Sequence, residues 1–144
     1  MNSPLQTPES YELFLYTLPE QFPACKRSTI TFVRRGASLA RVAGELYFDH
    51  DIRLVLRERL VYQRLPVMID WYGYEVWRGD EKLYWYDSQP HPDEALLQST
   101  HPHHKHIPPD IKHHRIPATE MSFTRPNLPA LIREIEALIN AIEG

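Results

Sequence analysis

Residues 67–87, VMIDWYGYEVWRGDEKLYWYD, contain two strand-like segments joined by a short polar turn. Alternation with a period of two divides the first segment into Val67, Ile69, Trp71 and Trp77 on one face, and Asp70, Tyr72 and Tyr74 on the other. Residues 78–81 are typical of a hairpin turn, and the second strand contains Trp85 and ends at Asp87. The stretch therefore predicts an antiparallel hairpin with its tryptophans in the core.

The rest of the chain extends this hairpin into a sheet. Alternating strands with short connections run from about residue 28 to the hairpin, which favours an antiparallel meander. A helix is predicted to start at Thr7-Pro8-Glu9, and a second helix with a wide apolar stripe follows Asn127. We therefore expect a single α+β domain over residues 1–144: a twisted antiparallel sheet of four to five strands, an N-terminal and a C-terminal helix, and a long His-rich loop at residues 88–123.

Composition limits the classes of protein to which the chain can belong. The 144 residues are 42% hydrophobic and 24% charged, which argues against wholesale disorder. The net charge of −3 carries no global signature of nucleic-acid binding, so attraction for phosphate would be local. The single Cys25 favours a reducing compartment, and no segment resembles a signal peptide or a membrane span. The expected location is the cytoplasm, with no membrane partner.

Seven of the eight histidines lie between His91 and His114, and four of them belong to the motif HPHHKH at residues 101–106. In an extended segment His101 and His103 point one way, and His104 and His106 point the other. Such a pair could bind a transition metal with Asp87 or His91, although the spacing matches no common zinc motif.

Proton transfer is the alternative use of these rings. RNA cleavage needs a base for the 2′-hydroxyl, an acid for the leaving oxygen and cations for the phosphorane. We expect His103 and His104 to transfer protons and Lys105 to bind phosphate, with His106 in the same motif and His91 in reserve. No cofactor is then required, although a divalent metal is an option. Alternatively, individual imidazoles serve only to hydrogen-bond backbone carbonyls.

Two carboxylates are candidates for a supporting catalytic or metal-binding role beside the histidines. Glu58 shares the parity of the apolar residues on its strand, so on an unbroken strand it would be buried and would need a partner. Because arginines flank it and a bulge would return it to solvent, the sequence favours a surface ion pair. Asp87 can orient an imidazole or bind a metal, and capping a turn is an equally good interpretation.

Aromatic side chains and the first histidine of the motif are candidates for RNA contact. Tyr72 and Tyr74 could stack bases on the second face of the sheet, with His101 nearby. Tyrosines in such positions more often pack half-buried under a loop, and we expect this arrangement here.

The chain resembles the TumE family, whose members are toxin components of prokaryotic toxin–antitoxin pairs. The resemblance rests on Tyr72-Gly73-Tyr74, Tyr86-Asp87, Pro90-His91 and Pro102-His103-His104-Lys105-His106 in that order, with Glu58 on the preceding strand. Ser88-Gln89 and Pro92 depart from the commoner family residues, which indicates a divergent branch. The resemblance implies a toxin with a small cognate antitoxin protein as its partner.

The sequence thus favours a cytoplasmic toxin that acts as an endoribonuclease through His and Lys acid–base chemistry, with Asp87 and Glu58 as supporting groups. The alternative is a non-catalytic module that binds a metal or a protein partner through the His-rich loop.

Overall fold

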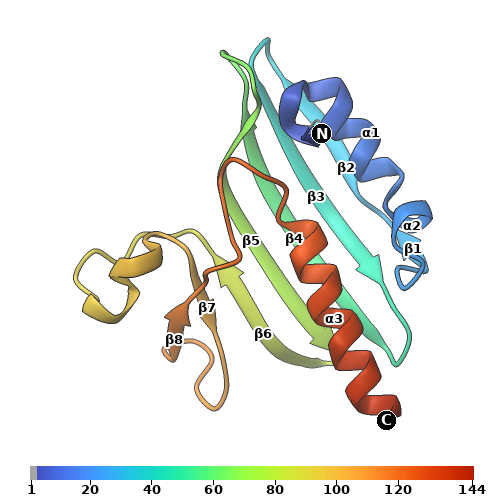
Figure 1. The fold of residues 1–144 in the computed structure, drawn as a ribbon, viewed down its shortest axis with the longest axis vertical. Helices are drawn as coiled ribbons and strands as arrows, with labels where there is room; N and C mark the ends of the chain where they lie inside the picture. The colour runs from blue at the N-terminus through green and yellow to red at the C-terminus, as the bar shows by residue number, and fades with distance from the viewer. Residues whose placement is uncertain (1–2) are drawn as a thin grey trace.

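The structure, a computed structural model, describes residues 3–144 as one antiparallel sheet with helices α1 and α3 packed on the same face (Figure 1). The strand order is β1-β3-β4-β5-β6-β7-β8, and β2 also pairs with β3. The strands are β1 (Arg27–Ser28), β2 (Thr31–Arg35), β3 (Leu39–Tyr47), β4 (Ile52–Val61), β5 (Met68–Arg78), β6 (Glu81–Asp87), β7 (His104–His106) and β8 (Arg115–Pro117). The helices are α1 (Pro8–Tyr16), α2 (Leu18–Gln21) and α3 (Leu128–Glu143), with short 3-10 segments η1 (Pro4–Gln6) and η2 (Ala95–Thr100).

Helices α1 and α3 begin at the predicted positions, after Thr7 and Asn127. Only α1 is capped by the side chain of the residue that precedes it. The Thr7 hydroxyl accepts from the backbone N–H of Ser10, and the Ser10 hydroxyl accepts in return, which completes a capping box. Asn127 precedes α3 without capping it with its side chain. Its amide instead donates to the Tyr74 hydroxyl and to the carbonyl of Ser122.

The sheet has eight strands among the described residues, more than the four to five predicted. Three of the additional strands, β1, β7 and β8, have only two or three residues each. Strands this short show no measurable alternation, and they form because a neighbouring strand already provides hydrogen-bonding partners. The segment at 88–123 is consequently not one loop, since β7 and β8 extend the sheet beyond β6 (Figure 1).

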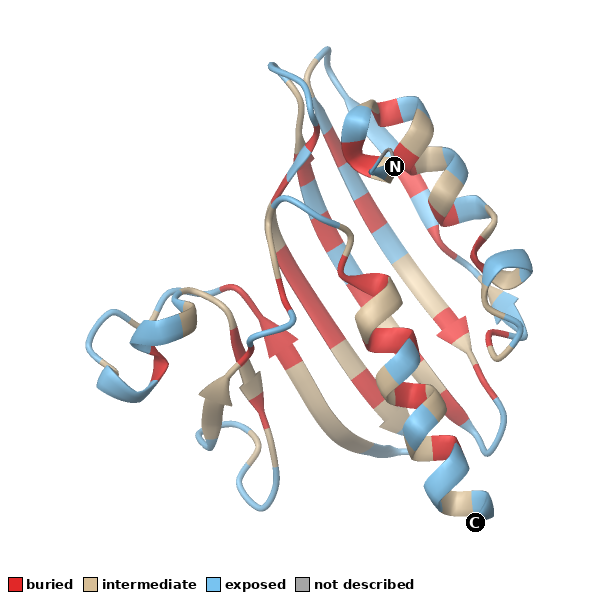
Figure 2. Cartoon of the chain, viewed as in Figure 1, coloured by how far each residue is buried: buried red, intermediate tan, exposed pale blue. Residues whose placement is uncertain are grey.

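The core lies between the helices and one face of the sheet, where many residues of β3, β4 and β5 are buried (Figure 2). The predicted faces of the central hairpin are wrong after Asp70, although Val67 and Ile69 are buried as predicted. Tyr72 and Tyr74 are fully buried on the helix side of the sheet, whereas Trp71, Trp77 and Trp85 are partly exposed on the opposite face.

A β-bulge causes this reversal. Trp71 pairs with Arg59 and Ile69 pairs with Leu60, so Asp70 is an extra residue on β5. One extra residue changes the parity of everything after it. Ile69 therefore shares a face with the tyrosines that follow Asp70, and not with Trp71.

The second face of the sheet carries no helix of residues 3–144 (Figure 1). Arg41, Arg57 and Arg59 are exposed on this face, and Trp71, Trp77 and Trp85 are partly exposed there together with Glu45 and Glu75. Within the same residues, no helix has the length and apolar character needed to cross a bilayer. We call this surface the helix-free face.

Candidate active site

Asp87, His104 and His106 form a buried cluster where β6 meets β7. The pairing of these strands sets Asp87 opposite His104 and Trp85 opposite His106, so their side chains lie on the helix-free face. Nε2 of His104 lies 2.8 Å from Asp87 Oδ1, and Nε2 of His106 lies 3.4 Å from Oδ2. The two Nε2 atoms are 3.1 Å apart. One carboxylate thus faces two imidazoles.

Backbone carbonyls determine which ring nitrogens carry protons. Nδ1 of His104 lies 3.0 Å from the carbonyl oxygen of Pro102, and Nδ1 of His106 lies 2.7 Å from that of Ile111. Because a carbonyl can only accept, we assign a proton to each Nδ1. In neutral rings both Nε2 atoms would then present lone pairs to each other and to the Asp87 carboxylate. The cluster therefore requires positive charge between these atoms.

A proton on one Nε2 or a bound metal ion can supply this charge. The two Nε2 atoms and one carboxylate oxygen all lie within 4.8 Å of one another. A tetrahedral zinc site with bonds of 2.0–2.1 Å would separate its ligand atoms by roughly 3.3 Å, close to the distances above. Carbonyl acceptors behind both rings are typical supports of metal-binding histidines. Asp87, His104 and His106 are therefore the residues that could hold a metal.

The Asp87 carboxylate is ionised throughout the neutral pH range. Its burial acts to raise its pKa, but hydrogen bonds from His104 and His106 outweigh burial and hold the pKa well below its usual range. The backbone N–H of Gln89 also donates to Oδ1 over 3.0 Å. The carboxylate thus balances whichever cation the cluster holds.

Two further rings enclose the cluster. The Trp85 indole stacks on His106, with ring centroids 3.7 Å apart and planes 12° from parallel. The His91 ring lies edge-on to His104 at 4.8 Å and remains partly exposed. Burial, the nearby charge of Arg115 and that of His104 lower the pKa of His91. His91 is thus an accessible imidazole that is neutral near pH 7.

The other half of the histidine motif lies on the helix side of the sheet. His103 Nδ1 is 2.6 Å from the Tyr72 hydroxyl, and the two rings are stacked. Lys105 donates to Glu134 of α3 over 2.9 Å and lies over the Tyr84 ring. The structure thus brings Asp87, His91, His104 and His106 together but separates His103 and Lys105 from them.

Glu58 is also on the helix side, in the core. Its carboxylate accepts from the hydroxyls of Tyr11 at 2.6 Å and Tyr74 at 2.5 Å. Only 2% of the residue is exposed, so the predicted surface ion pair is wrong. Burial raises the pKa of Glu58 against the opposing effect of the two hydroxyls. Tyr72 and Tyr74 are fully buried as well, so neither presents a stacking surface to solvent.

The remaining histidines of the segment are exposed. His101 lies at the rim of a shallow cavity on the helix side. His113 pairs with Asp110 at 3.1 Å, and Nδ1 of His114 lies 3.0 Å from the carbonyl of Pro108. These contacts are local to the turn between β7 and β8.

A cavity of about 200 Å³ opens beside Asp87 on the helix-free face. Its lining consists of Arg57, Trp71, Gly73, Glu75, Trp85, Asp87 and Gln89. Gly73 lies between its pairing partners, Arg57 on β4 and Asp87 on β6. Because glycine has no side chain, the space between the side chains of Arg57 and Asp87 is open. Arg57 and Gly73 were not among the site residues predicted from the sequence. The available signal was a glycine in the middle of a strand, which often marks close approach of a ligand.

Replacing Gly73 with alanine is expected to stabilise the protein. The φ angle of Gly73 is not positive, and a Cβ atom would lie 3.7 Å from Trp71 Cη2 and 3.9 Å from Arg57 Nη2, both ordinary contacts. Loss of backbone freedom in the unfolded chain should raise the free energy of unfolding by about 0.5–1 kcal/mol. Urea denaturation measures the change. A loss of stability would show that the cavity floor cannot accept a methyl group.

The fold and the cluster define a small α+β protein with helices on one face of its sheet and an Asp–His–His site on the other. The family model described as Toxin TumE matches residues 15–139. The chain therefore belongs to the TumE toxin family, as its sequence motifs indicated. Neither the curated proteins nor the solved structures include a significant match to the chain.

Proposed function

We propose that this chain is the toxin of a prokaryotic toxin–antitoxin pair, is held inactive by a small cognate antitoxin protein, and acts as an endoribonuclease. Family membership supports the toxin role. The observation that carries the enzymatic role is the buried cluster of Asp87, His104 and His106, in which one carboxylate faces two imidazoles beside an open cavity. Groups of this kind are able to donate protons and to stabilise anionic transition states.

The proposed reaction is attack of a ribose 2′-hydroxyl on the adjacent phosphorus, with release of the 5′-oxygen of the next nucleotide. His91, accessible and neutral, takes the 2′-hydroxyl proton. A proton held between Asp87 and His104 is delivered to the leaving oxygen. The Arg57 guanidinium, across the gap at Gly73, stabilises the charge on the phosphorane. The products are a 2′,3′-cyclic phosphate and a free 5′-hydroxyl.

The test is RNA cleavage by the full chain made by cell-free synthesis, which avoids toxicity to a host. We expect a labelled single-stranded RNA to yield fragments with 2′,3′-cyclic phosphate ends. Expression in cells is expected to arrest growth, and co-expression of the cognate antitoxin, expected to be encoded by a small neighbouring gene, should relieve the arrest. Intact RNA after incubation with folded protein, both with added divalent metals and with EDTA, would contradict the ribonuclease proposal.

A second candidate function is metal binding without catalysis. It is favoured by the burial of His104 and His106, by their carbonyl-supported Nδ1 atoms and by the spacing of the three ligand atoms. Titration with Zn²⁺, followed by the stacked Trp85 fluorescence, distinguishes the two functions. Stoichiometric binding without RNA cleavage would favour a structural metal site. Cleavage that EDTA abolishes and Zn²⁺ restores would assign the metal to the reaction.

A further inference from the structure

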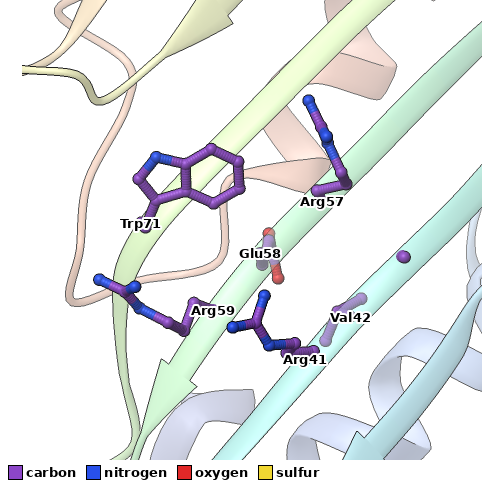
Figure 3. Close-up of a pocket in the computed structure, with 7 residues that line it drawn as sticks. Arg41, Val42, Arg57, Glu58, Arg59 and Trp71 are labelled. Carbon is purple, nitrogen blue, oxygen red and sulfur yellow. The ribbon is translucent and has the colours of Figure 1, made fainter.

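Three cavities with shared lining residues lie in a row across the helix-free face, the last of them beside Asp87, and we call this row the groove. The central cavity, about 260 Å³, is lined by Arg41, Arg57, Arg59 and Trp71 (Figure 3). It shares Arg41 and Arg59 with a cavity of about 410 Å³ that also contains Arg35. It shares Arg57 and Trp71 with the cavity beside Asp87. The groove thus runs from β3 across β4 and β5 to the cluster on β6.

Like charges lie next to one another along the groove. Arg41 pairs with Arg59 across β3 and β4, and Arg57 is two residues from Arg59 on the same face of β4. Like charges at directly opposed positions destabilise a sheet. Arg59 forms an ion pair with Asp70 at 2.7 Å, whereas Arg41 and Arg57 form none within residues 3–144. These guanidinium groups are exposed and available to bind an anion.

Tryptophans accompany the arginines. Trp71 lines both the central cavity and the cavity beside Asp87, and the Arg57 guanidinium lies 5.6 Å from its ring centroid. Trp85 lines the end of the groove and stacks on His106. Partly exposed indole rings beside cationic groups are a means of gripping unpaired bases, because every base can stack on an aromatic ring. In a duplex the neighbouring stacked base pairs cover these faces, so such contact requires single-stranded RNA.

The geometry points to a binding groove for single-stranded RNA. We infer that Arg41, Arg57 and Arg59 bind successive phosphates, that Trp71 stacks on a base, and that the strand leads to Asp87. Three steps between adjacent strands, each about 4.8 Å, give the groove a length of roughly 14 Å, sufficient for a few nucleotides. The inference rests on the proposed ribonuclease function and adds the substrate class and the residues that bind it.

Binding can be measured separately from cleavage with a fluorescently labelled, single-stranded 2′-O-methyl oligoribonucleotide, which lacks the attacking hydroxyl. We expect Arg41→Gln/Arg57→Gln/Arg59→Gln to weaken binding by about 30-fold or more in fluorescence anisotropy. The slope of log K against log salt should fall by about 2, since single strands contribute about 0.7 per phosphate contact. Trp71→Ala should weaken binding by about tenfold through lost stacking.

A matched variant, Arg64→Gln/Arg78→Gln/Arg133→Gln, removes the same charge from exposed positions outside the groove. It is expected to bind the probe like the wild type, and annealing the probe to its complement should weaken binding at least about tenfold. Equal affinities of the two triple variants would overturn the inference. The inference would also be overturned if the groove variant no longer captured the antitoxin but kept its affinity for RNA. That result would identify the groove as a protein-binding surface. If the probe binds through the arginines but native RNA is not cut, the groove stands and the ribonuclease proposal fails.

Discussion

Asp87→Asn is expected to reduce the rate of RNA cleavage by about 10²–10⁴-fold, the range associated with loss of acid–base catalysis. The side chain lies 2.8 Å from Nε2 of His104 and within 3.4 Å of Nε2 of His106. The amide N–H groups of an asparagine can donate to the Nε2 lone pairs of His104 and His106. No carboxylate charge is then left in the cluster, so a proton or metal ion is no longer needed to balance it. The variant should therefore fold normally while losing its proton or metal.

Asp110→Asn is the matched control for this substitution. Asp110 pairs with His113 at 3.1 Å in the same segment, but both side chains are exposed and lie outside the cluster. This variant should cleave RNA at the wild-type rate. Cleavage rates are measured with thermal unfolding recorded for each protein. Wild-type activity in a folded Asp87→Asn variant would show that the cluster is structural and that catalysis occurs elsewhere.

Glu58→Ala is expected to lower the free energy of unfolding by about 4 kcal/mol, because it removes two buried hydrogen bonds worth about 1 kcal/mol each and leaves buried polar groups unsatisfied at about 1–3 kcal/mol each. The substitution leaves the hydroxyl of Tyr11 without its Glu58 partner, removes the acceptor of Tyr74, and opens space in the core. For a chain of this size the melting temperature should fall by about 10 °C. Calorimetry measures the change.

Glu58→Gln separates hydrogen bonding from charge. Glutamine can accept from Tyr74 and donate to Tyr11, so most of the stability should be retained. Burial raises the pKa of Glu58 in the folded protein, so folding favours the protonated carboxyl. The stability gained from this protonation is fully present below the ordinary pKa, about 4.5, and is lost as the pH rises through the folded-state pKa. The wild type should therefore lose stability relative to Glu58→Gln as the pH increases from 4 towards neutrality. A difference that does not change with pH would mean that Glu58 keeps an ordinary pKa in the fold.

Local sequence patterns located the helices and the central strands, but they assigned the wrong faces in the central hairpin. Alternation located the central strands, and Thr7 and Asn127 marked the helix starts. The face assignment failed at Asp70, because a single bulged residue reverses parity and no local pattern announces it. The short strands β7 and β8 were missed because their formation depends on β6, which is distant in sequence.

The sequence by itself determined the family, the antiparallel sheet with a helix before it and a helix after it in the chain, and the placement of His104 and His106 on one side of an extended segment. Each of these follows from neighbouring residues, since side chains two apart on a strand share a face. Only the tertiary structure decided that Asp87 meets those rings, that Glu58 binds two buried tyrosines, and that the arginines form a groove. These contacts join residues from different strands and helices, so they depend on register and on which face the helices cover. Both are set by long-range packing.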